Sequence, residues 1–222
     1  MNGAPGWEPK LLHLWPTLLT RAVLGGHATR NDELIALVER MDADAEQMTS
    51  RYQAVDIFSL EEPCIAWLRE GIDAAINRYL VGVGVDYGVR WKVRGWANVN
   101  RRGDYHSPHN HGWSYLSGTY YVRVPEQPAN LPGGNSPSAR PAADAPAARP
   151  AAISFYDPRG TVNMLARAGE GIARHEHPVT PTPGTVMLWN SFLNHSVHPN
   201  LADVSRITIS FNVALAWTDE LA

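Results

Sequence analysis

The chain has 222 residues, a formal net charge of −3 and an apolar content of 44%, an ordinary balance for a folded globular protein. The small charge and the lack of a dense Lys/Arg cluster argue against a nucleic-acid partner. The single cysteine, Cys64, excludes an internal disulfide framework and a multi-cysteine metal site. Because the sequence has no long apolar run and no evident export signal, we expect a cytoplasmic protein with no membrane partner.

The first part of the chain, residues 1–88, is predicted to be a helical N-terminal support that follows an extended entry segment at 11–21. Asn31 is expected to cap one helix, and Glu62-Pro63 to open another that ends near Gly82. Each helix has an apolar stripe that needs a surface to cover, so both are predicted to pack outside a sheet. These stripes are Leu34, Ile35, Leu37, Val38 and Met41, and then Ile65, Leu68, Ile72, Ala75, Ile76 and Leu80.

The second part, residues 89–216, changes to short β-rich runs between Gly, Pro and Asn. It predicts a mainly β core, a sandwich or barrel with flanking helices (α+β), within a single domain of residues 1–222. The Pro/Ala-rich stretch 125–152 is predicted to be a long mobile surface loop, either a lid or an insertion with no role. The predicted strands are 91–98, 117–124, 153–156, 185–189 and 205–213.

The most informative motif is His109-Asn-His111. Flanking Pro108 and Gly112 disfavour a helix, and on a strand the two imidazoles would project from one face. Paired imidazoles are poor core filler but suit a first-row transition metal. His175-Glu-His177 has the same spacing and is the rival pair.

A third ligand is available from the segment 189–200, which offers His195 and His198. The strand after it alternates strictly. Ile207, Ile209, Phe211 and Val213 share one face, while Arg206, Thr208, Ser210 and Asn212 share the other. Such a polar face is typical either of a solvent-exposed strand or of the inner wall of a small barrel. In a barrel wall, the guanidinium of Arg206 would match a carboxylate.

Together these features resemble the iron(II)/2-oxoglutarate-dependent dioxygenases, whose marks are a His-x-Asp/Glu pair, a distal His and a later Arg or Lys. His195 precedes Arg206 by 11 positions. Five segments are similar to a bacterial and phage subgroup of 2-oxoglutarate/iron oxygenases over residues 90–213, with a weaker match at 14–17. They are Trp96-Ala-Asn98, His109-Asn-His111, Leu116-Ser-Gly-Thr-Tyr-Tyr-Val122, Asp157-Pro-Arg159 and Arg206-Ile-Thr-Ile-Ser-Phe-Asn212.

The resemblance implies a double-stranded β-helix (jelly-roll or cupin-like) and an enzyme that takes Fe(II), 2-oxoglutarate and dioxygen. It implies that His109, His111 and His195 are the catalytic metal ligands and that His198 is not. Arg206 and Thr208, with Tyr121, would bind the distal carboxylate of 2-oxoglutarate. Tyr121 is equally compatible with a core aromatic role.

One departure from the family pattern is His111, which stands where a carboxylate is usual. Two alternatives therefore remain open: a cupin-like metal enzyme without 2-oxoglutarate, and a non-catalytic metal-containing binding module. Hydroxylation of a small molecule or a peptide side chain is the expected reaction, and the sequence does not identify the substrate. Trp96, Trp113 and Trp189 are candidates for a pocket wall, although most tryptophans are expected in the core. A homodimer is compatible with the sequence.

Overall fold

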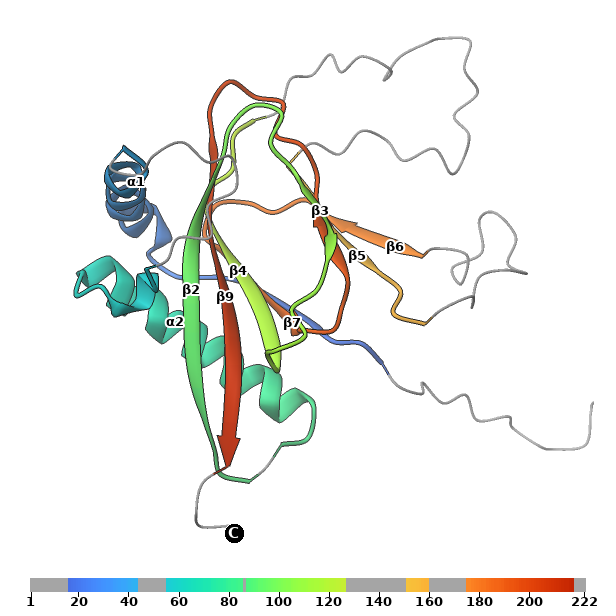
Figure 1. The fold of residues 1–222 in the computed structure, drawn as a ribbon. Helices are drawn as coiled ribbons and strands as arrows, with labels where there is room; N and C mark the ends of the chain where they lie inside the picture. Colours follow the sequence, from blue (N-terminus) through green and yellow to red (C-terminus); the bar gives the residue numbers. More distant parts are fainter. Residues whose placement is uncertain (1–15, 44–54, 86, 127–150, 160–174, 218–222) are drawn as a thin grey trace, which may run out of the picture.

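Two antiparallel sheets face each other in the computed structural model, which describes residues 16–43, 55–85, 87–126, 151–159 and 175–217 (Figure 1). The larger sheet has the strand order β1-β7-β4-β9-β2, and the smaller one the order β3-β8-β5-β6. The strands are β1 (Leu19–Val23), β2 (Val89–Asn100), β3 (His106–His109), β4 (Leu116–Arg123), β5 (Ile153–Tyr156), β6 (Glu176–Val179), β7 (Thr185–Asn190), β8 (His195–Val197) and β9 (Arg206–Trp217).

Helices α1 (His27–Ala43) and α2 (Pro63–Gly82), with the 3-10 helix η1 (Ile57–Ser59), cover the outer face of the larger sheet (Figure 1). The predicted stripes are confirmed, because Leu34 and Leu68 are fully buried in the core that the helices share with this sheet. None of the helices in the described ranges is long and apolar enough to cross a membrane.

Strand β9 shows how this packing shapes the interior of the molecule. Its apolar residues, among them Ile209 and Phe211, point outward and join the helix-covered core. Its alternate residues Arg206, Thr208 and Ser210 therefore point between the two sheets, where they line a cavity. The prediction that this polar face forms an inner wall is confirmed. The apolar core between the sheets is correspondingly small: Tyr121, Ile153, Phe155, Val179, Met187, Trp189 and Leu193.

The prediction that Asn31 caps a helix is wrong. Helix α1 begins at His27, and Asn31 lies within it, buried against the sheet. Its amide nitrogen donates to the Val122 carbonyl (2.9 Å), and its amide oxygen accepts a hydrogen bond from the Tyr120 hydroxyl (2.6 Å). Both partners belong to β4, so Asn31 ties the helix to the sheet by satisfying two polar groups that would otherwise be buried alone.

All five predicted strands are present, as β2, β4, β5, β7 and β9, within a few residues of the expected bounds. The short strands β3, β6 and β8 carry no alternation that could reveal them. His111 lies beyond the end of β3, so the prediction that one strand carries both His109 and His111 is wrong. Of the predicted loop 125–152, residues 127–150 lie outside the described part of the chain. The division into 1–88 and 89–216 stays a prediction.

Replacing Leu68 with Ala should lower the free energy of unfolding by about 2–5 kcal/mol, because a fully buried side chain leaves a cavity. The exposed Val81 on the same helix is the control, and Val81→Ala should change stability by less than about 0.5 kcal/mol. Urea unfolding followed by circular dichroism measures both. Equal effects of the two substitutions would show that α2 does not pack as described.

Candidate metal centre

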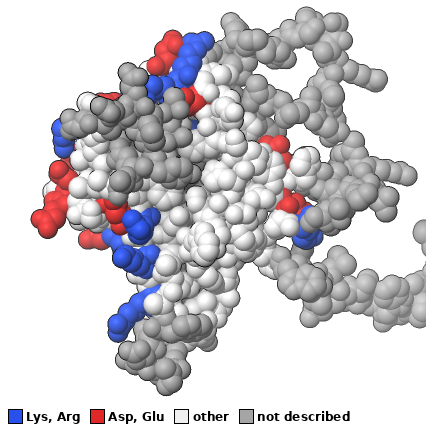
Figure 2. Space-filling view, in the orientation of Figure 1, with Lys and Arg blue, Asp and Glu red and all other residues white. Residues whose placement is uncertain are grey.

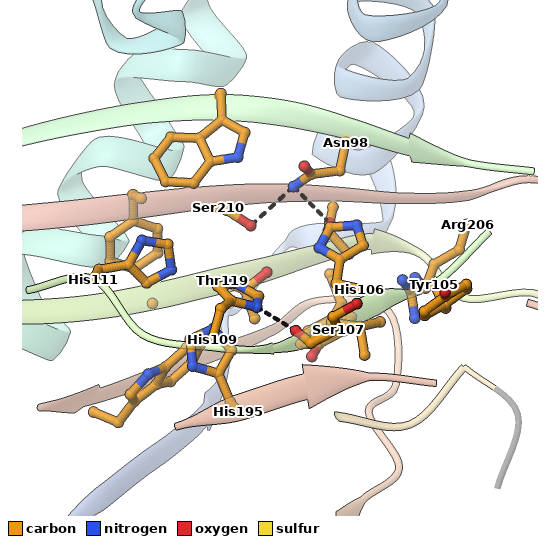
Figure 3. A pocket seen from close by; sticks show the side chains of 17 residues that line it. Asn98, Tyr105, His106, Ser107, His109, His111, Thr119, His195, Arg206 and Ser210 are labelled. Atoms are coloured by element: carbon orange, nitrogen blue, oxygen red, sulfur yellow. Dashed lines mark hydrogen bonds between the residues drawn. The ribbon is translucent and has the colours of Figure 1, made fainter. Parts of the chain in front are cut away.

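A cavity of about 330 Å³ opens between the two sheets, and three histidines lie at one end of it (Figure 3). His109 ends β3, His111 follows two residues later, and His195 begins β8. The antiparallel pairing of β3 with β8 sets His109 directly opposite His195. One nitrogen from each imidazole lies within 4.8 Å of the others, so the three can share one metal ion.

Backbone carbonyls fix the orientation of two of these imidazoles. Nδ1 of His109 lies 2.6 Å from the Ser107 carbonyl oxygen, and Nδ1 of His195 lies 3.0 Å from that of Leu193. Because a carbonyl oxygen only accepts hydrogen bonds, each Nδ1 must carry the proton. Nε2 of each ring is left unprotonated, which is the form that binds a metal.

Burial also disfavours protonation of two of the three rings, those of His111 and His195. Burial, followed by the neighbouring His109, lowers the pKa of His111 to about 4. Burial also lowers the pKa of His195 to about 3; the hydrogen bond to Leu193 opposes this, and the nearby histidines add to it. Both rings are therefore neutral at physiological pH without a metal. Imidazoles with a free ring nitrogen suit a first-row transition metal.

At the other end of the cavity, the guanidinium of Arg206 is buried, with 1% of the residue exposed (Figure 3). It donates from Nη2 to Oδ1 of Asn100 (2.8 Å) and from Nη1 to the Ala151 carbonyl (3.2 Å), while Nε has no partner. Burial lowers its pKa to about 10, partly offset by Tyr121 and Asp104, so it stays charged. A buried cation with only neutral partners is costly unless the cavity supplies an anion.

Thr208 and Tyr121 line the same cavity, on strands that pair with each other, and the register sets them directly opposite one another. The Thr208 hydroxyl accepts a hydrogen bond from the Asn98 amide (3.3 Å). Burial raises the pKa of Tyr121, so its hydroxyl stays protonated and able to donate. The structure thus brings together all six residues that the sequence singled out, with the histidines at one end and the Arg206 group at the other.

His106 is a cavity residue to which the sequence assigned no role. Asn100 must present Oδ1 to Arg206, which can only donate, so its amide nitrogen faces Nε2 of His106 at 3.1 Å. Nε2 is therefore the acceptor, and the proton of His106 resides on Nδ1. Burial, with Arg206 and His109, lowers the pKa of His106 to about 4, so the ring is neutral. Trp96, Asn98 and Asn100 alternate along β2 and so share one face, and the two asparagines on that face are the sequence signal that could have indicated this wall.

The rival histidines lie elsewhere. His175 and His177 are exposed at β6, and His198 sits 2.7 Å from the Ser154 hydroxyl and 3.5 Å from the Glu176 carboxylate. Within the described ranges, His109, His111 and His195 form the one group of three or more metal-binding side chains close enough to share an ion.

Comparison with known proteins agrees with this geometry. The family model described as "Putative 2OG-Fe(II) oxygenase" matches residues 94–212, more than half of the chain. The chain therefore belongs to this family. Its members use Fe(II) and 2-oxoglutarate, and the three imidazoles form a site that can bind the metal. No curated protein sequence matches the chain significantly.

Several solved structures share the fold at low sequence identity. A prolyl-4-hydroxylase from Pseudomonas putida is 14% identical, with 87% of this chain and 85% of that chain covered and a TM-score of 0.51. A prolyl hydroxylase from Trichoplax adhaerens, in complex with a hypoxia-inducible-factor peptide, is 14% identical (88% and 83% covered, TM-score 0.55). The non-heme α-ketoglutarate-dependent epimerase SnoN is 17% identical (90% and 79% covered, TM-score 0.53). These likenesses confirm the double-stranded β-helix.

Replacing His195 with Ala should weaken Co(II) binding by at least about 100-fold, because it removes one of three nitrogen ligands. Isothermal titration of the metal-free protein measures this. His198→Ala, three residues away, is the matched control and should leave the affinity unchanged. Comparable losses in the two variants would place the metal elsewhere.

Acid should destabilise the metal-free protein through these buried rings. The unfolded chain protonates His106, His111 and His195 near pH 6.5, whereas the folded protein does so only near pH 3 to 4. The unfolded state therefore binds more protons in between, and the unfolding free energy must fall as the pH drops from 7 toward 4. The urea midpoint should decrease from pH 7.5 to pH 5. It should decrease less in His195→Gln than in the control His177→Gln, and equal decreases would contradict the assignment of the buried rings.

Proposed function

We propose that this chain is a hydroxylase that holds Fe(II) on His109, His111 and His195 and binds 2-oxoglutarate across the cavity to Arg206. When bound, Fe(II) with 2-oxoglutarate and dioxygen supplies an oxidation that releases succinate and carbon dioxide. The substrate is proposed to be a small molecule or a peptide side chain. A cytoplasmic location and a homodimer stay predictions.

The observation that carries the proposal is the buried, incompletely satisfied guanidinium of Arg206 in the same cavity as the three imidazoles. A carboxylate in the cavity would offset the charge of this guanidinium, whose hydrogen bonds within the described residues go only to the neutral oxygens of Asn100 and Ala151. The hydroxyls of Thr208 and Tyr121 border the same place and can add two hydrogen bonds. A cupin-like enzyme that uses no oxo-acid has no need for this buried cation.

Charge balance supports the same cosubstrate. Among the residues that the structure describes, the cavity wall contains no Asp or Glu: its residues are Trp96, Asn98, Tyr105, His106, Ser107, His109, His111, Gly118, Thr119, Tyr121, Trp189, His195, Val197, Arg206, Thr208, Ser210 and Phe211. A divalent metal on these imidazoles would therefore share the cavity with Arg206 at its other end, with no carboxylate among the described residues of the wall. A dicarboxylate whose keto-acid end reaches the metal and whose other end reaches Arg206 offsets both charges.

The all-histidine site is then consistent with the family's chemistry. Where most members supply a carboxylate, His111 supplies a neutral ring, so more of the negative charge must come from the ligand. The protein's part is to orient the ligand at Arg206, hold His109 and His195 by their carbonyl contacts, and keep bulk water from the cavity.

Succinate formation tests the proposal. The purified protein with Fe(II), 2-oxoglutarate and oxygen should form succinate slowly even without its substrate. The rate should fall to background when any of the three is withheld, and in His109→Ala. A protein that binds Fe(II) tightly yet forms no succinate, with or without candidate substrates, would support the non-catalytic binding module instead.

Arg206→Gln should raise the KM for 2-oxoglutarate by roughly 10- to 100-fold, because a hydrogen bond to a charged group contributes about 1.5–3 kcal/mol. Affinity for Co(II) should change by less than about threefold, since Arg206 touches no metal ligand. Arg206→Lys, which keeps the charge but not the fork, should fall in between. The exposed Arg102 provides the control Arg102→Gln. Equal loss of metal and cosubstrate affinity would mean that Arg206 has a purely structural role.

A further inference from the structure

A second pocket, of about 390 Å³, adjoins the metal cavity and shares Trp96 with it. The Trp96 ring lies 6.0 Å from the His111 ring, measured between centroids, so one side chain borders both spaces. This volume falls in the range of small-molecule sites. The pocket is lined by Val55, Asp56, Lys92, Arg94, Gly95, Trp96, Trp113, Ser114, Asn212 and Ala214.

Two segments run from the metal cavity into the second pocket. On β9, Ser210 lines the cavity, and Asn212 and Ala214 line the pocket on the same face. After His111, the next residues to line a wall are Trp113 and Ser114, which belong to the second pocket. Alternate residues of a strand are roughly 7 Å apart. A molecule seated near Lys92 or Arg94, which lie four and two residues from Trp96, would thus reach the metal with a body of ordinary small-molecule length.

The polar groups of the second pocket are mainly donors. Lys92 and Arg94 follow Arg90 along one face of β2, and Figure 2 shows Lys and Arg side chains in a row over its lower part. The one carboxylate, Asp56, accepts hydrogen bonds from the backbone amides of Phe58 (3.2 Å) and Gly95 (3.0 Å). It stands 3.9 Å from Arg94, and no ion pair between it and Lys92 is found in the described part of the chain.

Asn212 adds a further donor. Its amide oxygen accepts a hydrogen bond from the Ser117 hydroxyl (2.8 Å), which turns the amide nitrogen away from Ser117. Opposite Lys92 in the sheet stands Ala214, and its small side chain leaves the space above the two strands open. Lys92, Arg94 and Asn212 can therefore all donate to one anionic group.

Trp113 is fully exposed, at 101% of its reference surface, and is the most exposed large apolar side chain in the described ranges. It shares the pocket with Trp96. This exposed indole offers a flat apolar face beside the cationic groups. Such a pair of features matches a ligand with an apolar or planar body and an anionic end.

We propose that the second pocket binds the substrate of the oxygenase, and that this substrate is a small molecule with a carboxylate or phosphate on a planar or apolar body. The anion is held by Lys92, Arg94 and Asn212, and the body lies between Trp113 and Trp96 and points toward the metal. This inference rests on the proposed function, because it identifies the ligand as the substrate of the oxygenase. Binding of the ligand itself does not require metal or 2-oxoglutarate.

The test uses metal-free full-length protein and three probes: naphthalene-2-carboxylate, 2-naphthyl phosphate and the neutral 2-naphthalenemethanol. Isothermal titration should show that one or both anions bind at least about fivefold more tightly than the neutral probe, as expected for about 1 kcal/mol from exposed charges. The preferred anion identifies which of the two groups the pocket takes. Lys92→Gln should weaken anion binding by about fivefold, and Trp113→Ala should weaken binding of all three probes by roughly three- to tenfold.

Arg90, on the same face of β2 but outside the pocket lining, provides the matched control Arg90→Gln, which should bind the probes as the wild type does. Equal binding of charged and neutral probes, or equal losses in Arg90→Gln and Lys92→Gln, would overturn the proposal. Arg90, Lys92 and Arg94 would then form an ordinary solvent-exposed face of β2. Loss of anion binding in Arg206→Gln alone would also overturn the proposal, because the probe would then occupy the metal cavity. Succinate formation without substrate, measured in the wild type and in Arg90→Gln, reports on the proposed function independently of probe binding, which separates failure of this inference from failure of the proposed function.

Discussion

The packing of α1 and α2 against the outer face of the larger sheet is the constraint on which the rest of the structure depends. Because the helices bury Ile209, Phe211 and their neighbours on that side, the strands need not bury an apolar face between the sheets. The inner face is then free to carry Arg206, Thr208 and the polar residues of β2. The functional cavity exists because the main hydrophobic core lies outside the β-helix rather than within it.

Inside this polar interior, charge is the deciding quantity. His111 and His195 are neutral, no carboxylate is found among the described residues of the cavity wall, and Arg206 is a buried cation with one donor unused. The protein therefore presents an excess of positive charge as soon as a divalent metal binds. On the proposed function, an anionic cosubstrate would offset that excess, so that His111 could stand where the usual site has a carboxylate. The basic lining of the neighbouring pocket extends the same preference for anions outward from the metal.

The sequence indicated those parts of the molecule that have a clear periodicity. Strict alternation along residues 204–213 predicted both faces of β9 correctly, and the apolar stripes of α1 and α2 predicted their packing. Local sequence patterns gave a wrong or missing prediction where a residue's contacts are with residues distant in the sequence. Asn31 looked like a helix cap because its partners on β4 are 89 and 91 positions away. The role of His106 in the cavity wall depends on Asn100 and Arg206, and β3 is too short to show a period. The choice of His195 over His198 came from the family resemblance, and the structure gives its physical reason in the contacts of His198 with Ser154 and Glu176.

Anaerobic titration of the Fe(II)-loaded protein with 2-oxoglutarate tests most directly whether an all-histidine site and Arg206 bind this cosubstrate together. A weak visible charge-transfer band should appear and saturate at one equivalent of 2-oxoglutarate. In Arg206→Gln, the same band should need a much higher concentration of 2-oxoglutarate to reach half of its maximum. An Fe(II)-loaded wild-type protein that develops no band at any concentration of 2-oxoglutarate would contradict the assignment of the cavity as a cosubstrate site.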